Sequence, residues 1–331
     1  VYDKGYGKYG PAKGITELRK ALATRENCSE ENIMVCPGAR FGVYLAITTL
    51  LNPGDEIIVI EPAWPAYKDC ALNAGIKVRT IKTTLETRWL PSVDQINNAI
   101  NENTKMIVLN YPNNPTGRML PDESTDRDGV TIPSLFDRII QTAKEHNLYV
   151  LSDEIYSEYK QILEGTSVLS FGYKKSIVTK SFSKSHAMTG FRVGYVIADP
   201  SIIEKMSKLQ ALSLTNVSEP IQYVALQVID SAFEAVQENA ETIGIRLEIL
   251  VESAKDIGLE FIEPDGAMYL FAKTKYKNFD ATKFSEKLLE HGVAIAPGEG
   301  FGDYKEFFRI TAIDETKLKE GMIILDTVLK E

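Results

Sequence analysis

The chain has 331 residues, 44% of them hydrophobic, so it can bury a core larger than one hydrophobic centre usually supports, and we expect two domains. A formal net charge of -9 excludes the basic surface that nucleic acid binding requires, so no nucleic acid partner is expected. No apolar run approaches the roughly 20 residues that cross a bilayer, which indicates a soluble chain without a membrane partner.

Neither the cysteines nor the histidines are spaced as metal ligands. The three cysteines are Cys28, Cys36 and Cys70, and the three histidines are His146, His186 and His291. The cysteines lack Cys-x-x-Cys spacing, so neither a disulfide framework nor a zinc site is indicated. We therefore expect no metal site and a reducing, cytoplasmic location.

Short β-branched runs alternate with helix-like stretches from about residue 30 to 200, a pattern typical of crossover units and a mainly parallel sheet. The runs expected as strands buried on both faces are 55–60, 77–81, 105–110, 149–152, 176–179 and 193–197. Ligands of open α/β sheets bind beyond the carboxyl ends of strands. Functional residues are therefore sought just after these runs.

The second half of the chain has a different pattern. Residues 122–129 form an acidic segment expected to be a solvated loop without assigned function, and 133–146 has a helical pattern. Apolar residues at helical spacing over 219–257 predict long helices that link the sheet domain to a second one. Residues 259–331 mix strands and helices. We expect a large domain over 1–235 and a smaller α+β domain over 236–331.

A lysine among small hydroxyl residues follows the run 176–179, in the segment Ser181-Phe-Ser-Lys184-Ser-His-Ala-Met-Thr-Gly-Phe-Arg192-Val-Gly194-Tyr. A lysine shielded from water and near other cations is the type that forms Schiff bases. Arg192 is suited to supply that cation and to fork onto phosphate oxygens, and Ser181 to donate a further hydrogen bond. The alternative is a surface lysine in a serine-rich loop.

This segment resembles the cofactor-lysine motif of class I/II aminotransferases, which are pyridoxal-phosphate (PLP) enzymes of fold type I. The resemblance covers nearly the whole chain, from Tyr9 to Arg309, with the motifs in family order. It implies a three-layer α/β sandwich with a mainly parallel sheet and a smaller α+β C-terminal domain. It also implies PLP as the cofactor, bound to Lys184 as an aldimine, with Ser181 and Arg192 on its phosphate.

Two further segments carry the resemblance. In Asp153-Glu-Ile-Tyr156 it implies that Asp153 pairs with the pyridine nitrogen and that Tyr156 hydrogen-bonds the ring hydroxyl; an acidic first turn of a helix is the alternative. In Asn110-Tyr-Pro-Asn-Asn114-Pro115-Thr-Gly117 it implies that Asn114 contacts the ring hydroxyl and the substrate carboxylate, and that Asn114–Pro115 is cis. An ordinary turn is the alternative there.

The phosphate and the ring face have expected partners near the start of the chain. Pro37-Gly38-Ala39-Arg40 precedes a helix-like stretch, and the resemblance places the backbone groups of Gly38, Ala39 and Arg40 on the phosphate. In the segment 61–67 it places Trp64 over the pyridine face, with a buried core tryptophan as the alternative.

The resemblance also assigns Arg309, in Phe307-Phe-Arg309-Ile-Thr, to the substrate α-carboxylate through two parallel hydrogen bonds, where a salt-bridge arginine is the alternative.

Residues 5–10 satisfy the pattern G-x-G-x-x-G, but no strand precedes them and a nicotinamide site is rejected. They resemble instead the family segment whose tyrosine, here Tyr9, reaches the phosphate of the partner subunit. Thr215 is a second, looser match of this kind, and together they imply a homodimer.

The expected function is a PLP-dependent aminotransferase that moves the amino group of an L-amino acid, with aspartate favoured, to a 2-oxo acid such as 2-oxoglutarate. The catalytic residues would be Lys184, Asp153 and Tyr156. The family also has an N-terminal arm and small-domain portion before the Tyr9 segment, which we expect to be missing here. A PLP lyase of the same fold, or the aminotransferase-like sensor domain of a transcription regulator, is the alternative function.

Overall fold

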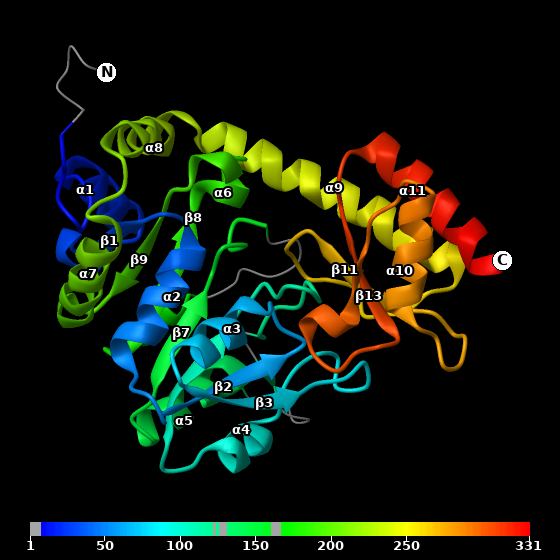
Figure 1. Cartoon of the computed structure of the whole chain (residues 1–331), viewed down its shortest axis with the longest axis horizontal. Helices are drawn as coiled ribbons and strands as arrows, with labels where there is room; N and C mark the ends of the chain where they lie inside the picture. Colours follow the sequence, from blue (N-terminus) through cyan, green and yellow to red (C-terminus); the bar gives the residue numbers. More distant parts are fainter. Residues whose placement is uncertain (1–7, 122–123, 126–130, 160–166) are drawn as a thin grey trace.

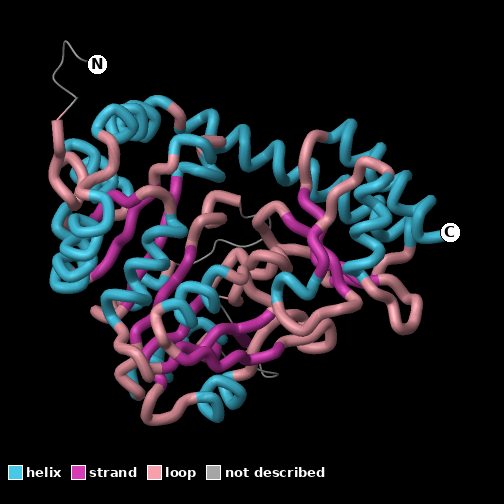
Figure 2. The backbone as a smooth tube through the Cα atoms, viewed as in Figure 1, coloured by secondary structure: helices cyan, strands magenta, loops and turns pink. Residues whose placement is uncertain are grey.

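The computed structural model describes residues 8–121, 124–125, 131–159 and 167–331. Two separate sheets are visible in Figure 2 as two groups of magenta strands. A long helix, α9 (Phe233–Ile257), runs from the larger body to the smaller one (Figure 1). The predicted α/β fold with a smaller second sheet and a linking helical region is confirmed.

The larger sheet has seven strands in the order β1-β9-β8-β7-β4-β2-β3. Its strands are β1 (Ile33–Cys36), β2 (Glu56–Glu61), β3 (Lys77–Lys82), β4 (Thr104–Leu109), β7 (Tyr149–Asp153), β8 (Ser176–Ser181) and β9 (Gly194–Ala198). All neighbouring pairs from β8 to β3 are parallel, whereas β9 is antiparallel to both β8 and β1. The mainly parallel sheet is therefore as predicted.

One strand differs from the prediction in its burial and another was missed. Residues 77–81 were expected to be buried on both faces, which is wrong, because β3 is an edge strand in which only Ile81 is buried. Strand β1 was not among the predicted runs, although all four of its residues are buried. It is a short strand of four residues at the edge of the sheet, where it borders the antiparallel β9.

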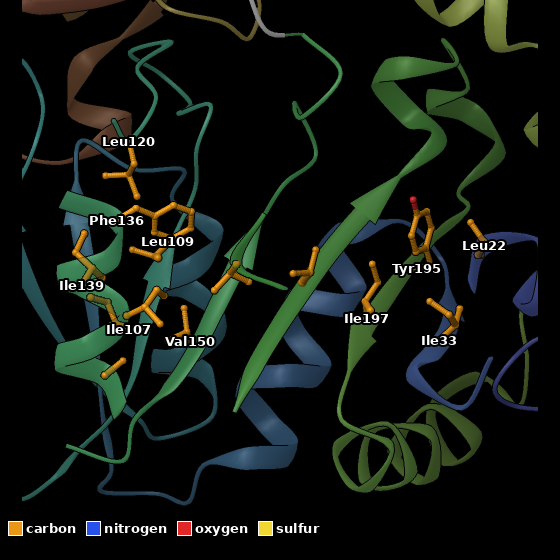
Figure 3. Packing of buried hydrophobic residues seen from close by; sticks show 14 of the residues in the cluster. Leu22, Ile33, Ile107, Leu109, Leu120, Phe136, Ile139, Val150, Tyr195 and Ile197 are labelled. Atoms are coloured by element: carbon orange, nitrogen blue, oxygen red, sulfur yellow. The ribbon is translucent and has the colours of Figure 1, made fainter. Parts of the chain in front are cut away.

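Helices cover both faces of this sheet and make three layers. Because neighbouring residues of a strand point to opposite faces, Ile58 and Ile107 contribute to one core and Ile57 and Met106 to the other. The first core, shown in Figure 3, is covered by α1 (Thr16–Arg25), α4 (Val93–Ala99), α5 (Leu135–Glu145) and α8 (Glu219–Ser231). The second is covered by α2 (Ala39–Leu50), α3 (Ala66–Asn73) and α7 (Pro200–Leu214).

The smaller sheet is antiparallel, in the order β10-β11-β13-β12, with β10 (Glu260–Phe261), β11 (Tyr269–Lys273), β13 (Phe307–Thr311) and β12 (Ala296–Pro297). The core beside it is formed with α9, α10 (Ala281–Glu290) and α11 (Glu315–Lys330). The boundary predicted after residue 235 falls in the first turn of α9. We propose that the large and small domains meet in this helix.

Two smaller features complete the fold. Helix α6 (Phe182–Ser185) follows β8, and a short pair joins β5 (Ser124–Thr125) to β6 (Thr131–Ile132). Most of the acidic segment 122–129 lies outside the described residues, and the part that is described forms β5 and no loop. Among the described helices, none combines the length and the apolar character needed to cross a membrane.

Candidate active site

The loops after β2, β4, β7 and β8 meet the smaller sheet around a cavity of about 340 Å³. The residues expected to be functional that line this cavity are Ala39, Arg40, Trp64, Asn114, Asp153, Tyr156, Lys184, Arg192 and Arg309. It is also lined by Tyr67, Asn110, Ile155, Ser183, Thr189 and Tyr269, which the sequence did not single out. Segments far apart in the chain are thus brought to one place, at the carboxyl ends of parallel strands.

Lys184 lies in α6, directly beyond the end of β8. Its side chain is half-buried and lines the same cavity as Asp153. The backbone around it is fixed, because the Tyr159 hydroxyl donates to the Lys184 carbonyl oxygen over 2.6 Å. Ser181 caps α6: its hydroxyl accepts from the Ser183 amide at 3.1 Å and lies 2.8 Å from the Ser183 hydroxyl. Ser181 is buried behind the cavity wall, whereas Ser183 lines the cavity.

The first turn of α2 and the loop before β9 form a cradle. Gly38 precedes the helix at φ +83°, and a Cβ there would lie 2.8 Å from a guanidinium nitrogen of Arg192. A Cβ on Gly194 would lie 2.9 Å from the Ala39 amide nitrogen. Because both positions lack a side chain, the first turn of α2 can lie close to Arg192 and to β9. The first amides of a helix have no partner within the helix, so they and the guanidinium can bind an anion here.

Trp64 follows β2 and is half-buried on the cavity wall. The Arg40 guanidinium carbon lies 4.8 Å from the centroid of its ring, and the Tyr67 ring meets it edge-on at 5.3 Å. The alternative of a buried core tryptophan instead describes Trp89, which is 2% exposed among aromatic rings. Trp64 thus lies on the cavity wall and outside the aromatic core that holds Trp89.

Asp153, the last residue of β7, is buried and held from two sides. The Tyr67 hydroxyl donates to its Oδ2 over 2.7 Å and the Thr179 hydroxyl to its Oδ1 over 3.1 Å. Burial raises the pKa of the Asp153 carboxyl to about 6, and these hydrogen bonds oppose that rise. A carboxylate in such a place is suited to a cationic partner in the cavity. Tyr67 was not identified from the sequence, where it looks like any tyrosine of a helix.

Asn110 ties the Asn114 loop to β7. Its amide donates to the Asp153 carbonyl oxygen over 2.9 Å, and its Oδ1 accepts from the Asn114 backbone N–H at 3.0 Å. The Asn114–Pro115 peptide is cis, as predicted. The Oδ1 of Asn114 accepts in turn from Nη1 of Arg309 at 2.8 Å, which links this loop to the smaller sheet.

Arg309 lies in β13 between two aromatic rings. Its guanidinium carbon is 4.3 Å from the ring centroid of Tyr269 and 5.1 Å from that of Phe301. Its Nε is buried and has no hydrogen-bond partner among the described residues. An arginine held in this way has free donors for a planar anion such as a carboxylate.

Two residues expected to act in a partner subunit lie away from this cavity. Tyr9 is 87% exposed, and Thr215, also exposed, ends α7 at a positive φ. Residues 5–7 of the G-x-G-x-x-G segment lie outside the described residues. Neither Tyr9 nor Thr215 is among the residues that line the cavity of this chain.

The charges on the cavity wall are unbalanced. Ion pairs between described residues include none of the three arginines Arg40, Arg192 and Arg309, and Asp153 is the carboxylate among the lining residues. With Lys184, the wall therefore attracts more than one anionic group. An anion at the α2 cradle and a second at Arg309, with an amine between them, would complement it.

The chain is similar to known proteins over nearly its full length. The model of the family "Aminotransferase class I and II" matches residues 3–323. The aspartate aminotransferase of Pyrococcus horikoshii is 35% identical, with 99% of this chain and 84% of that protein aligned. The aromatic-amino-acid aminotransferase 2 of Thermococcus litoralis is 30% identical over 99% of this chain and 86% of its own length. The crystal structure of the Thermotoga maritima aspartate aminotransferase has a TM-score of 0.89 at 32% identity, covering 99% of this chain and 86% of that one.

Proposed function

The chain belongs to the aminotransferase class I and II family, and from that premise we propose that it transfers the amino group of an L-amino acid, with aspartate as the first candidate, to a 2-oxo acid such as 2-oxoglutarate. Members of this family are PLP-dependent enzymes of fold type I. The observation that carries the proposal is the meeting of Lys184, Asp153 and Arg309 on one cavity.

The residues on the cavity wall fit pyridoxal phosphate as the cofactor. The α2 amides of Ala39 and Arg40, with Arg192, are suited to its phosphate, and the half-buried indole of Trp64 to its ring face. Gly38 belongs to this cradle because a side chain there would meet Arg192. Ser181 would support it through Ser183, since its hydroxyl is engaged with the hydroxyl and backbone of the α6 turn.

Bound pyridoxal phosphate supplies an aldehyde that condenses with amines and a protonated ring that accepts the electron pair left at the substrate α-carbon. Asp153 would hold the ring nitrogen protonated, because its buried carboxylate lacks a cationic partner among the described residues. Tyr156 and Asn114 would hydrogen-bond the ring hydroxyl. The positions of these side chains on the cavity wall support the proposed roles.

Substrate orientation would depend on Arg309 and Asn114. The free donors of Arg309 would bind the α-carboxylate in a two-bond fork, and the Asn114 contact to Arg309 would fix the plane of that fork. With the carboxylate fixed, the α C–H bond can be held perpendicular to the ring, which favours proton removal over loss of carbon dioxide. Lys184 would remove this proton as general base and return one as general acid.

Aspartate is proposed as donor with support from relatives named for it, and the aromatic-amino-acid aminotransferase among the relatives makes aromatic donors the first comparison.

We also propose a homodimer in which Tyr9 and Thr215 reach the partner's cavity. Their exposure supports this, because a large tyrosine side chain that is 87% exposed in the single chain has room to contact another subunit. The cysteines at 28, 36 and 70 are free, which supports a cytoplasmic location.

Incubation of the PLP-loaded protein with L-aspartate and 2-oxoglutarate tests the proposed reaction. Formation of glutamate and oxaloacetate in equal amounts supports it, and aromatic donors are compared in the same assay. Release of ammonia and pyruvate from a cysteine conjugate without an oxo-acid acceptor would instead show a lyase.

The proposed dimer is tested by mixing a Lys184→Ala chain with a Tyr9→Ala chain. Activity above the sum of the activities of the two separate variants indicates sites shared between subunits. If the mixture has no such excess activity, shared sites are contradicted.

A further inference from the structure

Tyr269, the first residue of β11, contacts two functional residues that come from different sheets. Its hydroxyl lies 2.7 Å from the hydroxyl of Tyr156, which follows β7 of the larger sheet. Its ring lies 4.3 Å from the guanidinium carbon of Arg309 in β13 of the smaller sheet. Both tyrosines are 5% exposed, so water does not separate these groups. Tyr269 is therefore placed to affect the ring-hydroxyl contact and carboxylate recognition together.

The hydroxyl pair has a simple constraint. Either oxygen can be the donor in the 2.7 Å contact, but each tyrosine has one hydroxyl hydrogen. If Tyr156 is to donate to a group in the cavity, its hydrogen cannot also go to Tyr269. Tyr269 must then be the donor, and donation to the Tyr156 oxygen makes the Tyr156 hydroxyl a stronger donor in turn.

The same residue supports Arg309 through its ring. The guanidinium lies between the faces of Tyr269 and Phe301, and its Nη1 donates to Asn114. A cation over an aromatic face is attracted by the ring quadrupole, and the attraction is strongest when water is excluded. The Tyr269 ring therefore limits where the guanidinium can move, independently of the Tyr269 hydroxyl.

We infer that Tyr269 is a positioning residue with two separable parts: its hydroxyl directs the Tyr156 hydrogen into the cavity, and its ring holds the Arg309 fork in place for a substrate carboxylate. The inference rests on the proposed function, because it gives the Tyr156 hydrogen a target, the ring hydroxyl of pyridoxal phosphate. It assigns Tyr269 no contact with substrate or cofactor.

Two variants of the full PLP-loaded protein separate the parts. Tyr269→Phe removes the hydroxyl and keeps the ring. The visible absorbance of the PLP-loaded protein should change with pH, and the midpoint of this change is the quantity to compare. Without the Tyr269 hydroxyl, the Tyr156 hydrogen bond stabilises the ionised oxygen of the pyridoxal phosphate ring less. The midpoint of the absorbance change should therefore rise by about half a pH unit or more. The dissociation constant of a non-reactive dicarboxylate, maleate, should stay within about twofold. Tyr269→Leu removes both parts, and the maleate dissociation constant should also rise by about tenfold.

A double-mutant cycle shows whether the hydroxyl acts through Tyr156. In a Tyr156→Phe background no hydroxyl is left to direct, so adding Tyr269→Phe should produce little further shift of the midpoint. Tyr304→Phe is the matched control. Tyr304 is also buried, and its hydroxyl also donates a hydrogen bond, to the Thr83 carbonyl oxygen, which the variant loses. Tyr304 does not line the cavity, so the absorbance midpoint and the maleate dissociation constant of Tyr304→Phe should match those of the unmodified protein.

An unchanged midpoint in Tyr269→Phe, or an equal shift with and without Tyr156, would overturn the role of the hydroxyl. Maleate binding by Tyr269→Leu equal to that of Tyr269→Phe would overturn the role of the ring. Failure of the proposed function gives a different result, since the unmodified protein would then form no glutamate from an amino acid and 2-oxoglutarate, whatever the Tyr269 variants show. Circular dichroism of each variant shows that the fold is retained.

Discussion

Replacement of Asp153 by Asn should make the stability of the cofactor-free protein less dependent on pH, and it should weaken PLP binding. The Asp153 carboxyl is buried, and burial raises its pKa from 3.8 to about 6. A raised carboxyl pKa means that the folded state takes up a proton more readily than the unfolded chain. The stability contributed by the neutral acid is therefore complete below about pH 4 and is lost as the pH rises through about 6. The difference of about two between the carboxyl pKa values of the folded and unfolded states corresponds to about 3 kcal/mol of stability.

Asparagine fills the same space and does not titrate, but it has one acceptor oxygen for the two hydroxyl donors Tyr67 and Thr179. That loss does not change with pH, so the pH dependence of the difference between the variant and the unmodified protein isolates the Asp153 carboxyl. Urea unfolding of both cofactor-free proteins between pH 4 and 7.5 measures it. The free energy of unfolding of Asp153→Asn, relative to the unmodified protein, should increase by about 2 to 3 kcal/mol across this range. A difference that stays constant with pH, or that decreases, would refute the argument. PLP titration of the same samples should show weaker binding to the variant.

Three further changes test other parts of the site. Arg309→Lys should lower kcat/KM for amino acids by about 100-fold, because lysine cannot form the two-bond fork, and should leave the PLP dissociation constant within about twofold. A decrease in PLP affinity as large as the decrease in kcat/KM would contradict the role of Arg309. Gly194→Ala places a Cβ 2.6 Å from the Lys180 carbonyl oxygen, so PLP affinity should fall at least tenfold in an absorbance titration, and unchanged affinity would show that the cradle can adjust. Arg118→Ala leaves the buried Asp265 without its 2.6 Å ion-pair partner and should cost about 3 to 5 kcal/mol in urea unfolding, whereas a cost below about 1 kcal/mol would mean that water replaces the pair.

The strand ends could be located from the sequence because parallel strands buried on both faces have continuous apolar runs. Lys184, Asp153 and Asn114 each follow such a run, and the structure brings them to one cavity. Their proposed chemical roles stay predictions. The helix predicted over 133–146 is observed as α5, which Ser134 caps by accepting from the Asp137 amide.

Other features depend on contacts that local patterns do not contain. Tyr67 matters because its hydroxyl donates to the carboxylate of Asp153, 86 residues away. Tyr269 matters because its hydroxyl contacts the hydroxyl of Tyr156, 113 residues away. A buried tyrosine in a helix or strand usually reads as core, so only the fold reveals these partners. The exposure of β3 was also hidden, since a β-branched run does not say whether its strand lies at an edge. An edge position follows from strand order alone.

The central claim is that Lys184 is the residue that binds pyridoxal phosphate covalently. Borohydride reduction of the PLP-loaded protein, followed by proteolysis and mass spectrometry, tests it directly. The account predicts one phosphopyridoxyl adduct, on the peptide that contains Lys184, and none in a Lys184→Ala variant. An adduct on another lysine, or an adduct that persists in that variant, would contradict it.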